Sequence, residues 1–313
     1  MNVMLCGDFD DAEARAWQQA LAAAMPEAHW WTREQAHARP AEVQAAVVAN
    51  PPPGSLQGLP ALRLIQSLWA GVDRLLADTT LPAGVPIARM VDPAMNAAMA
   101  ETALWATLAL QRDFFTYARQ QRQGRWLQHA QRRADEWPVL VLGQGEMGRA
   151  TARALAGVGF AVTGWSRTEG PHETGVTRIA GEAALWQALP QARVLINLLP
   201  LTAQTSGLLN ARLFAALPRG AGLVNLARGR HVVDADLLAA LASGQLAHAV
   251  LDVFQQEPLP ADHPFWAHER ITVLPHVAAQ TDCRSAAAVT VANLRALRDG
   301  QPLRHLVDRA RGY

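Results

Sequence analysis

Three polar residues in the second half of the chain carry side chains that could together reduce a carbonyl group. Arg228, Glu257 and His276 each follow a short apolar run typical of a buried strand. Arginine can pair with a carboxylate in a bidentate fork and polarise the adjacent carbonyl. Histidine can give a proton to the oxygen as hydride arrives at carbon, and a neighbouring glutamate would favour the protonated imidazole. The three residue types therefore fit the reduction of a 2-oxo acid.

Each of these residues also has a purely structural interpretation. An arginine after a strand is commonly part of a surface ion pair, and Glu-Pro and Pro-His are common turns. The prediction depends on the combination of all three behind a dinucleotide-binding turn. The histidines with no comparable place at a strand end are expected to be surface or structural residues; they are His231, His248, His263 and His268.

The turn in question lies at residues 139–148, where four apolar residues run into Gly143-x-Gly145-x-x-Gly148 ahead of an alanine-rich stretch. This order predicts a strand, a tight turn and a helix. The first glycine permits the turn, the second lets the backbone approach a pyrophosphate, and the third lets the helix pack against the strand. The helix N-terminus would then offer free N–H groups and partial positive charge to the phosphates. The cofactor-binding residues predicted here are Gly143, Gly145, Glu146, Met147 and Gly148.

The end of the next predicted strand indicates which dinucleotide is used. A carboxylate at this place would hold the ribose 2′-hydroxyl of NAD(H) and repel a 2′-phosphate. The strand at 161–165 ends instead in Ser166 and Arg167, which can donate to a 2′-phosphate. The sequence favours NADP(H), with NAD(H) as the alternative because Glu169 follows closely. A solvated loop arginine is the structural interpretation of Arg167.

Composition excludes several classes of protein. The chain has 313 residues, 50% of them hydrophobic, and a net charge of +1, which indicates a globular protein without a global nucleic-acid signature. No apolar run approaches the roughly 18 residues of a membrane span, and the N-terminus lacks a signal-peptide pattern, so a cytoplasmic location is expected. Two cysteines are too few for a disulfide framework or a zinc site, and no metal is expected. All 28 basic residues are arginine, which excludes chemistry that needs a lysine.

The order of predicted elements indicates two domains. Short strands at 3–6, 47–50, 62–67 and 85–88, with a helix at 12–24, predict a first parallel sheet. A second series of six strands follows, at 139–142, 161–165, 194–198, 222–225, 249–253 and 271–274. We expect an α/β protein with two doubly wound parallel-sheet domains. A Rossmann dinucleotide-binding domain (97–283) would be inserted in a flavodoxin-like substrate domain (1–96 and 284–313).

Two further segments receive predictions. A long helix at 97–123 would connect the domains, and a last helix at 284–299 would pack back on the first domain. The arginine-rich segment 119–137 contains Trp126 and Trp137. Since the whole chain is nearly neutral, a solvated loop or a subunit contact is a better interpretation than a nucleic-acid patch.

Several motifs occur in an order that resembles the D-isomer-specific 2-hydroxyacid dehydrogenases. These are the glycine turn, NLARG at 225–229, LDVF-x-x-EP at 251–258 and PHVA at 275–278. Within the family, WSR at 165–167, LPLT at 199–202 and LWAGVD at 68–73 are similar to the glyoxylate/hydroxypyruvate reductase A branch. The resemblance implies reduction of glyoxylate and hydroxypyruvate by NADPH. Alternatives are a different 2-oxo acid, or a dinucleotide-sensing binding protein of the same fold.

The resemblance also implies roles for individual residues. His276 would be the acid/base, Glu257 its partner, and Arg228 the ligand of the substrate carboxylate and carbonyl. Backbone N–H groups of a loop in the first domain would hold the substrate carboxylate, and Trp69 would either restrict the pocket or serve packing. The residues of this loop are Trp69, Ala70, Gly71 and Val72. The resemblance implies three further cofactor residues: Leu199 and Pro200 would form a wall of the cofactor site, and Asp252 would hold the nicotinamide carboxamide. The family implies a homodimer, with contacts expected near the helix after Ala97 and near Trp126.

Overall fold

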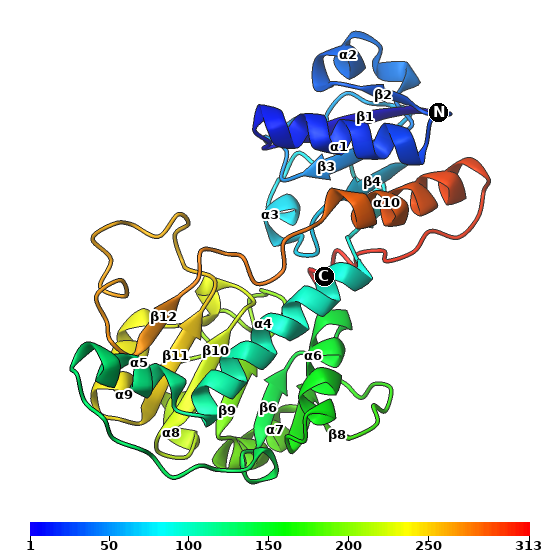
Figure 1. The fold of residues 1–313 in the computed structure, drawn as a ribbon. Coiled ribbons are helices and arrows are strands. Elements are labelled where there is room, and N and C mark those ends of the chain that lie inside the picture. Colours follow the sequence, from blue (N-terminus) through cyan, green and yellow to red (C-terminus); the bar gives the residue numbers. More distant parts are fainter. The chain divides into compact units, whose positions relative to one another are not determined.

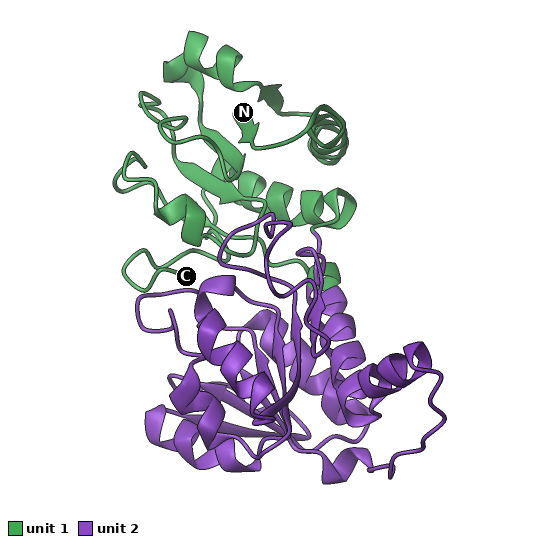
Figure 2. Cartoon of the chain, turned by 90° about the vertical axis from the view of Figure 1, so that its left-hand side faces the viewer, with its two compact units in different colours: residues 1–95, 281–313 green, residues 96–280 purple.

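The computed structural model describes all 313 residues and divides into two compact units. Unit 1 comprises residues 1–95 and 281–313, and unit 2 comprises residues 96–280 (Figure 2). The first expected boundary, after residue 96, lies one residue from the observed one. The second, after residue 283, lies three residues from it.

Unit 1 is built on a five-stranded parallel sheet in the order β2-β1-β3-β4-β5 (Figure 1). This is the flavodoxin-like order. The central strand β3 is buried along its whole length, as its uninterrupted apolar sequence predicts. The strand β2 was not predicted, because three residues give too short a pattern. The strands are β1 Asn2–Gly7, β2 His29–Trp31, β3 Ala45–Ala49, β4 Leu64–Ser67 and β5 Ile87–Ala88.

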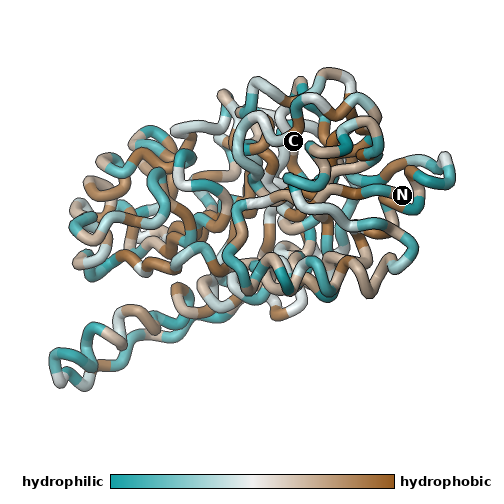
Figure 3. The backbone as a smooth tube through the Cα atoms, turned by 90° about the horizontal axis from the view of Figure 1, so that it is seen from above, coloured by the Kyte–Doolittle hydropathy of each residue, from teal (hydrophilic) through white to brown (hydrophobic).

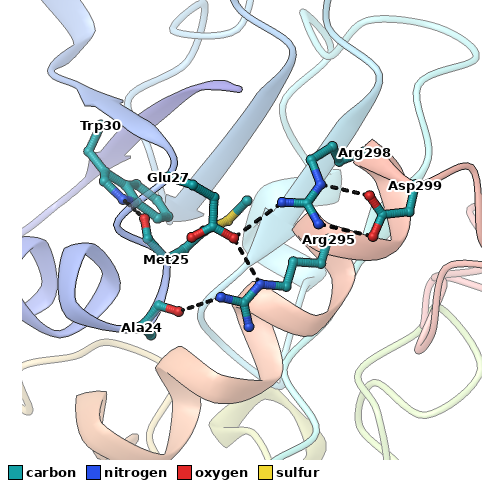
Figure 4. Close-up of polar contacts among 7 residues, drawn as sticks. All are labelled: Ala24, Met25, Glu27, Trp30, Arg295, Arg298 and Asp299. Atoms are coloured by element: carbon teal, nitrogen blue, oxygen red, sulfur yellow. Dashed lines mark hydrogen bonds and ion pairs between the residues drawn. The ribbon is translucent and has the colours of Figure 1, made fainter.

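Helices from both ends of the chain cover this sheet. They are α1 Asp11–Ala24, α2 Arg33–Ala38, the 3₁₀ turn η1 Pro40–Glu42, α3 Asp73–Leu76 and α10 Cys283–Arg298. The Asp10 side chain caps α1 by accepting from the backbone N–H groups of Ala12 and Glu13. The last helix lies beside the end of α1, as Figure 4 shows: Arg295 donates to the carbonyl of Ala24, and Arg295 and Arg298 both contact Glu27, at 3.1 and 3.2 Å. The C-terminal helix is thus part of unit 1.

Unit 2 is built on a seven-stranded parallel sheet in the order β12-β11-β10-β9-β6-β7-β8. Six of these strands have the Rossmann order, and β12 adds an edge. The expected fold class is therefore confirmed. The strands are β6 Val139–Leu142, β7 Val162–Ser166, β8 Val176–Ala180, β9 Val194–Asn197, β10 Ala221–Asn225, β11 Leu246–Leu251 and β12 Ile271–Val273.

Alternate residues of the central strands enter two separate cores. Val139 and Val141 face a core that includes α4 and α6, whereas Leu140 and Leu142 face one that includes α7, α8 and α9. Burial on both faces explains the continuous apolar run before the glycine turn. The helices are α4 Pro93–Gln111, α5 Phe114–Arg122, α6 Glu146–Gly157, α7 Glu182–Ala188, α8 Ala211–Ala216 and α9 Asp234–Ala242, with 3₁₀ turns η2 Ala134–Glu136, η3 Leu189–Gln191 and η4 Gly229–His231.

Two sequence predictions for unit 2 were wrong. The count of six strands omitted β8, an edge strand in which Thr177 and Arg178 interrupt the apolar pattern. The single helix at 97–123 is two helices, because Asp113 adopts a left-handed conformation with φ of 57°. Aspartate tolerates this conformation better than most residues, so no glycine or proline marks the break.

The helix α5 and the following residues 123–133 project from the rest of unit 2. This segment is mostly hydrophilic and extends at the lower left of Figure 3. Trp126 lies within it and is 94% exposed. No helix in the structure combines the length and apolar character that a membrane span needs.

Candidate active site

The three predicted catalytic residues all lie in loops after neighbouring strands. Arg228 follows β10, Glu257 follows β11 and His276 follows β12, and these strands are adjacent and parallel in the sheet. The carboxyl ends of parallel strands share one edge, which is where ligands bind in open α/β sheets. The topology therefore brings the three loops together.

His276 and Glu257 form a hydrogen-bonded pair. The distance from Nδ1 of His276 to Oε2 of Glu257 is 2.7 Å. The other carboxylate oxygen of Glu257 accepts the backbone N–H of Phe254 at 2.8 Å. Since an ionised carboxylate only accepts, Nδ1 carries the proton in this bond.

This pair shifts the protonation equilibria of both residues. The hydrogen bond to Glu257 raises the pKa of His276 above its ordinary value, against the opposing effect of burial. Burial would raise the pKa of Glu257, but its hydrogen bonds from His276 and Phe254 lower it below the ordinary value. The positive charge of Arg228 lowers the pKa of both groups, which places all three in one electrostatic cluster.

Asp252 holds the turn that carries His276. The residue is 1% exposed, and its carboxylate accepts the backbone N–H groups of Val277 and Ala278, at 2.7 and 3.1 Å. The backbone N–H of His276 donates to the carbonyl of Asp252, and His276 has a left-handed φ of 55°. Burial raises the pKa of Asp252 despite these bonds. Asp252 thus holds the backbone of the turn from which the His276 side chain extends.

The Arg228 loop lies directly against the Glu257 loop. A Cβ atom at Gly229 would come 1.8 Å from the carbonyl carbon of Phe254, so only glycine fits there. The Arg228 backbone is extended and its Nη1 donates to the carbonyl of Ala227 at 2.7 Å. Close approach of these two backbones keeps Arg228 near the histidine pair.

A buried polar network contacts the backbone of Arg228, and this network was not predicted from the sequence. His231 is fully buried; its Nδ1 lies 3.1 Å from the carbonyl oxygen of Arg228 and its Nε2 lies 3.3 Å from that of Pro200. Asn197 contacts both His231 and Asn225, and Asn225 donates to the carbonyl of Arg228. His231 is therefore a structural residue, which is one of the two roles expected for it from the sequence. The position of both asparagines at strand ends was the only available signal.

The glycine turn has the close contacts that its motif predicts. Gly143 has φ of 92°, and a Cβ atom there would lie 2.6 Å from the carbonyl oxygen of Leu198. A Cβ atom at Gly148 would lie 1.8 Å from the carbonyl oxygen of Gly143, whereas one at Gly145 would meet no atom within 4 Å. The helix α6 begins at Glu146, with Gly145 as its N-cap. The turn fits a pyrophosphate, because the space beside Gly145 is open and lies at a helix N-terminus.

The other predicted cofactor residues are placed as follows. Glu146 pairs with Arg149 at 2.5 Å, and Met147 packs partly buried on the core under α6. Ser166 ends β7, and its hydroxyl donates to the carbonyl of Thr168 at 2.7 Å. Arg167 is exposed and its Nη1 donates to Gln204 at 2.8 Å. Leu199 is buried, and the backbone of Pro200 contacts His231 and Thr205.

The predicted substrate loop Trp69–Val72 belongs to unit 1 and follows β4. The hydroxyl of Ser67 accepts the backbone N–H of Trp69, and the Trp69 ring packs edge-to-face on Trp17 at 6.5 Å. Ala70 and Gly71 are partly exposed, and Val72 is buried. Trp69 therefore packs against Trp17 within unit 1.

The fold and the strand-end site together define a dinucleotide-dependent oxidoreductase. The model of the D-isomer specific 2-hydroxyacid dehydrogenase NAD binding domain matches residues 104–278. The chain belongs to the D-isomer-specific 2-hydroxyacid dehydrogenase family. The expected enzyme class is thereby confirmed.

Relatives also support the expected branch. Glyoxylate/hydroxypyruvate reductase A of Yersinia enterocolitica is 39% identical and that of Serratia proteamaculans 41% identical, each with both chains fully covered. A D-isomer specific 2-hydroxyacid dehydrogenase from Xanthobacter autotrophicus, solved with NADPH and MES, is 41% identical at a TM-score of 0.94, covering 100% of this chain and 99% of that one. An NADPH-dependent glyoxylate/hydroxypyruvate reductase from Sinorhizobium meliloti, solved with NADP and sulfate, is 34% identical at 0.92 with the same coverage.

Proposed function

We propose that this protein reduces small 2-oxo acids, glyoxylate and hydroxypyruvate, to 2-hydroxy acids with NADPH. The observation that carries the proposal is the His276–Glu257 pair beside Arg228 at the carboxyl edge of the sheet. The names of the similar reductases, and the NADPH and NADP bound in two similar structures, support the choice of substrate and cofactor.

The cofactor proposal follows the geometry of unit 2. The glycine turn and the start of α6 would hold the pyrophosphate, and Ser166 and Arg167 the 2′-phosphate. Leu199 and Pro200 would flank the nicotinamide, and Asp252 would contact its carboxamide. When bound, the reduced nicotinamide supplies the hydride.

The chain's own residues perform the remaining tasks. Arg228 binds the substrate carboxylate and polarises the carbonyl. His276 has Nδ1 directed to Glu257, so its Nε2 gives a proton to the carbonyl oxygen as that oxygen gains negative charge. The Glu257 carboxylate keeps the imidazole protonated before transfer. The backbone N–H groups of the Ala70–Val72 loop are the proposed second ligand of the carboxylate, and Trp69 the residue that restricts substrate size.

The assay of this proposal combines two substrates with two cofactors. Purified protein is given glyoxylate or hydroxypyruvate with NADPH or NADH, and loss of the reduced-nicotinamide absorbance is followed. We expect fast oxidation of NADPH with either acid and slow oxidation of NADH. Equal rates with both cofactors would contradict the cofactor choice. No oxidation with either acid would contradict the substrate choice, and other 2-oxo acids would then be assayed.

A homodimer in the cytoplasm completes the proposal. The exposed Trp126 on the segment 123–133, with exposed Phe114 on α5, offers apolar surface for a second copy. Light scattering after size-exclusion chromatography gives the mass of the assembly. A mass of a single chain at micromolar concentration would contradict the dimer.

A further inference from the structure

An arginine of the unpredicted strand β8 lies between the two phosphate-binding parts of unit 2. Nη1 of Arg178 donates to Oε1 of Gln144 at 3.0 Å, and Nη2 donates to the hydroxyl of Ser166 at 3.0 Å. Gln144 lies inside the glycine turn, and Ser166 lies at the tip of β7. One guanidinium thus connects the pyrophosphate turn to the strand end expected at the adenosine ribose.

The neighbouring backbone is shaped to allow this bridge. Gly164 of β7 is the register partner of Arg178, and a Cβ atom at Gly164 would lie 2.5 Å from the Gln144 amide. Glycine therefore lets the Gln144 side chain lie across β7 and reach Arg178. A Cβ atom at Gly170 would lie 2.6 Å from Nη2 of Arg178, so the loop after β7 also passes close to the guanidinium.

The charge at this place suits an anion. Both of the arginine's hydrogen bonds described above go to neutral oxygen atoms, so they leave its positive charge uncompensated. Burial lowers the pKa of Arg178, and the charge of Arg149 lowers it further, while Glu173 acts in the opposite direction. Glu173 itself contacts Arg149 at 3.7 Å and Arg153 at 2.9 Å. The positive charge of Arg178 therefore lies beside the Ser166 hydroxyl, to which its Nη2 donates.

We propose that Arg178 is a specificity-determining residue for the cofactor, which recognises the 2′-phosphate of NADP(H) together with Ser166. Arg178 supplies a fixed cation and orients the Ser166 hydroxyl, whereas the exposed Arg167 supplies a mobile second cation. This inference rests on the proposed function, since it requires that unit 2 binds a dinucleotide. It assigns part of the cofactor preference to a residue outside the strand-end motif.

The test measures binding directly and does not depend on turnover. Isothermal titration gives dissociation constants for NADP⁺, NAD⁺ and 2′,5′-ADP with the wild type and the variants Arg178→Gln and Arg178→Lys. Arg153→Gln is the matched control, because Arg153 pairs with Glu173, whose charge also acts on Arg178, and lies on α6. Melting temperatures check that each variant is folded. If Arg178→Gln does not fold, the comparison is made with Arg178→Lys alone.

We expect Arg178→Gln to weaken NADP⁺ and 2′,5′-ADP by about tenfold or more, the scale of one hydrogen bond to a charged group. Binding of NAD⁺ should stay near the wild-type value. Arg178→Lys should lie between, because it keeps the charge and loses the fork. Arg153→Gln should leave all three ligands unchanged.

Two results would overturn the inference alone. One is an equal loss of NAD⁺ and NADP⁺, which would mean that Arg178 only holds β8 and the glycine turn in place. The other is a wild-type preference for NADP⁺ that survives in both Arg178 variants. A wild type that binds NAD⁺ as tightly as NADP⁺ would instead contradict the cofactor part of the proposed function, and this inference with it.

Discussion

The two ends of the proposed cofactor site in unit 2 are constructed differently. At the catalytic end, Arg228, Glu257 and His276 lie in loops that are fixed by buried groups such as Asp252 and His231. At the adenosine end, Ser166 is partly exposed and Arg167 is exposed, and the support comes from one arginine of an edge strand. We infer from this comparison that the proposed catalytic groups are held rigidly, whereas the proposed cofactor choice depends on a few exchangeable contacts near the surface.

The largest expected effect is at His276. Its replacement by alanine removes the proposed proton donor and should lower kcat by about 10²-fold or more. Binding of NADP⁺ should stay near the wild-type value, because the adenosine end is untouched. Steady-state kinetics and titration on the same preparation measure both. Near-normal turnover in the folded variant would remove His276 from the mechanism.

A smaller effect is expected at Arg167, at the opposite end. Arg167→Ala should raise the KM for NADPH by about tenfold, the scale of a charge-assisted hydrogen bond, with little effect on NADH or on kcat. Initial rates at varied concentrations of each cofactor check this. Equal losses for the two cofactors would mean that Arg167 does not read the 2′-phosphate.

His231 tests whether the buried support of the catalytic end matters. His231→Phe removes the buried hydrogen bonds that the imidazole makes with the Asn197 amide and the Pro200 carbonyl, which should cost about 1–3 kcal/mol of folding free energy. We also expect a higher KM for the 2-oxo acid, because the Arg228 loop is less firmly held. Urea unfolding and substrate kinetics are the measurements. Lost stability with an unchanged KM would make the network purely structural.

The smallest effect is a shift in pH dependence. Because Glu257 raises the pKa of His276, the reductive rate should persist above the ordinary histidine pKa of about 6.5 and fall as pH rises through the raised value. Glu257→Gln should move this limb to lower pH. The pH profiles of kcat/KM for both proteins check the prediction. Superimposable profiles would show that Glu257 does not set the pKa of the proton donor.

The His276–Glu257 pair should also make the free energy of unfolding depend on pH. The raised pKa of His276 stabilises the fold below its unfolded-state pKa, and this contribution is lost as pH rises through the folded value. The lowered pKa of Glu257 stabilises the fold above its unfolded-state pKa and is lost as pH falls through the folded value. The pair therefore contributes most between the ordinary pKa values of the two side chains.

The sequence predicted those features that depend on local pattern. The glycine turn and the strand-end motifs each lie within about ten residues, so their order was enough to place Arg228, Glu257 and His276 on one sheet edge. Features that depend on distant partners were not predicted. The role proposed for Arg178 depends on its contacts with Gln144 and Ser166, and only the pairing of β7 with β8 brings these residues near it. The break at Asp113 was also missed, because a left-handed aspartate leaves no compositional mark.

The most direct test of carbonyl reduction at this site follows the hydride itself. NADPH carrying deuterium at the transferred position of the nicotinamide is incubated with glyoxylate and either wild type or His276→Ala, and the product is examined by NMR. We predict glycolate with one deuterium on its carbinol carbon for the wild type, formed at least about 10²-fold more slowly by the variant. Absence of deuterium from the wild-type product, or equal rates of deuterium transfer by both proteins, would contradict the account.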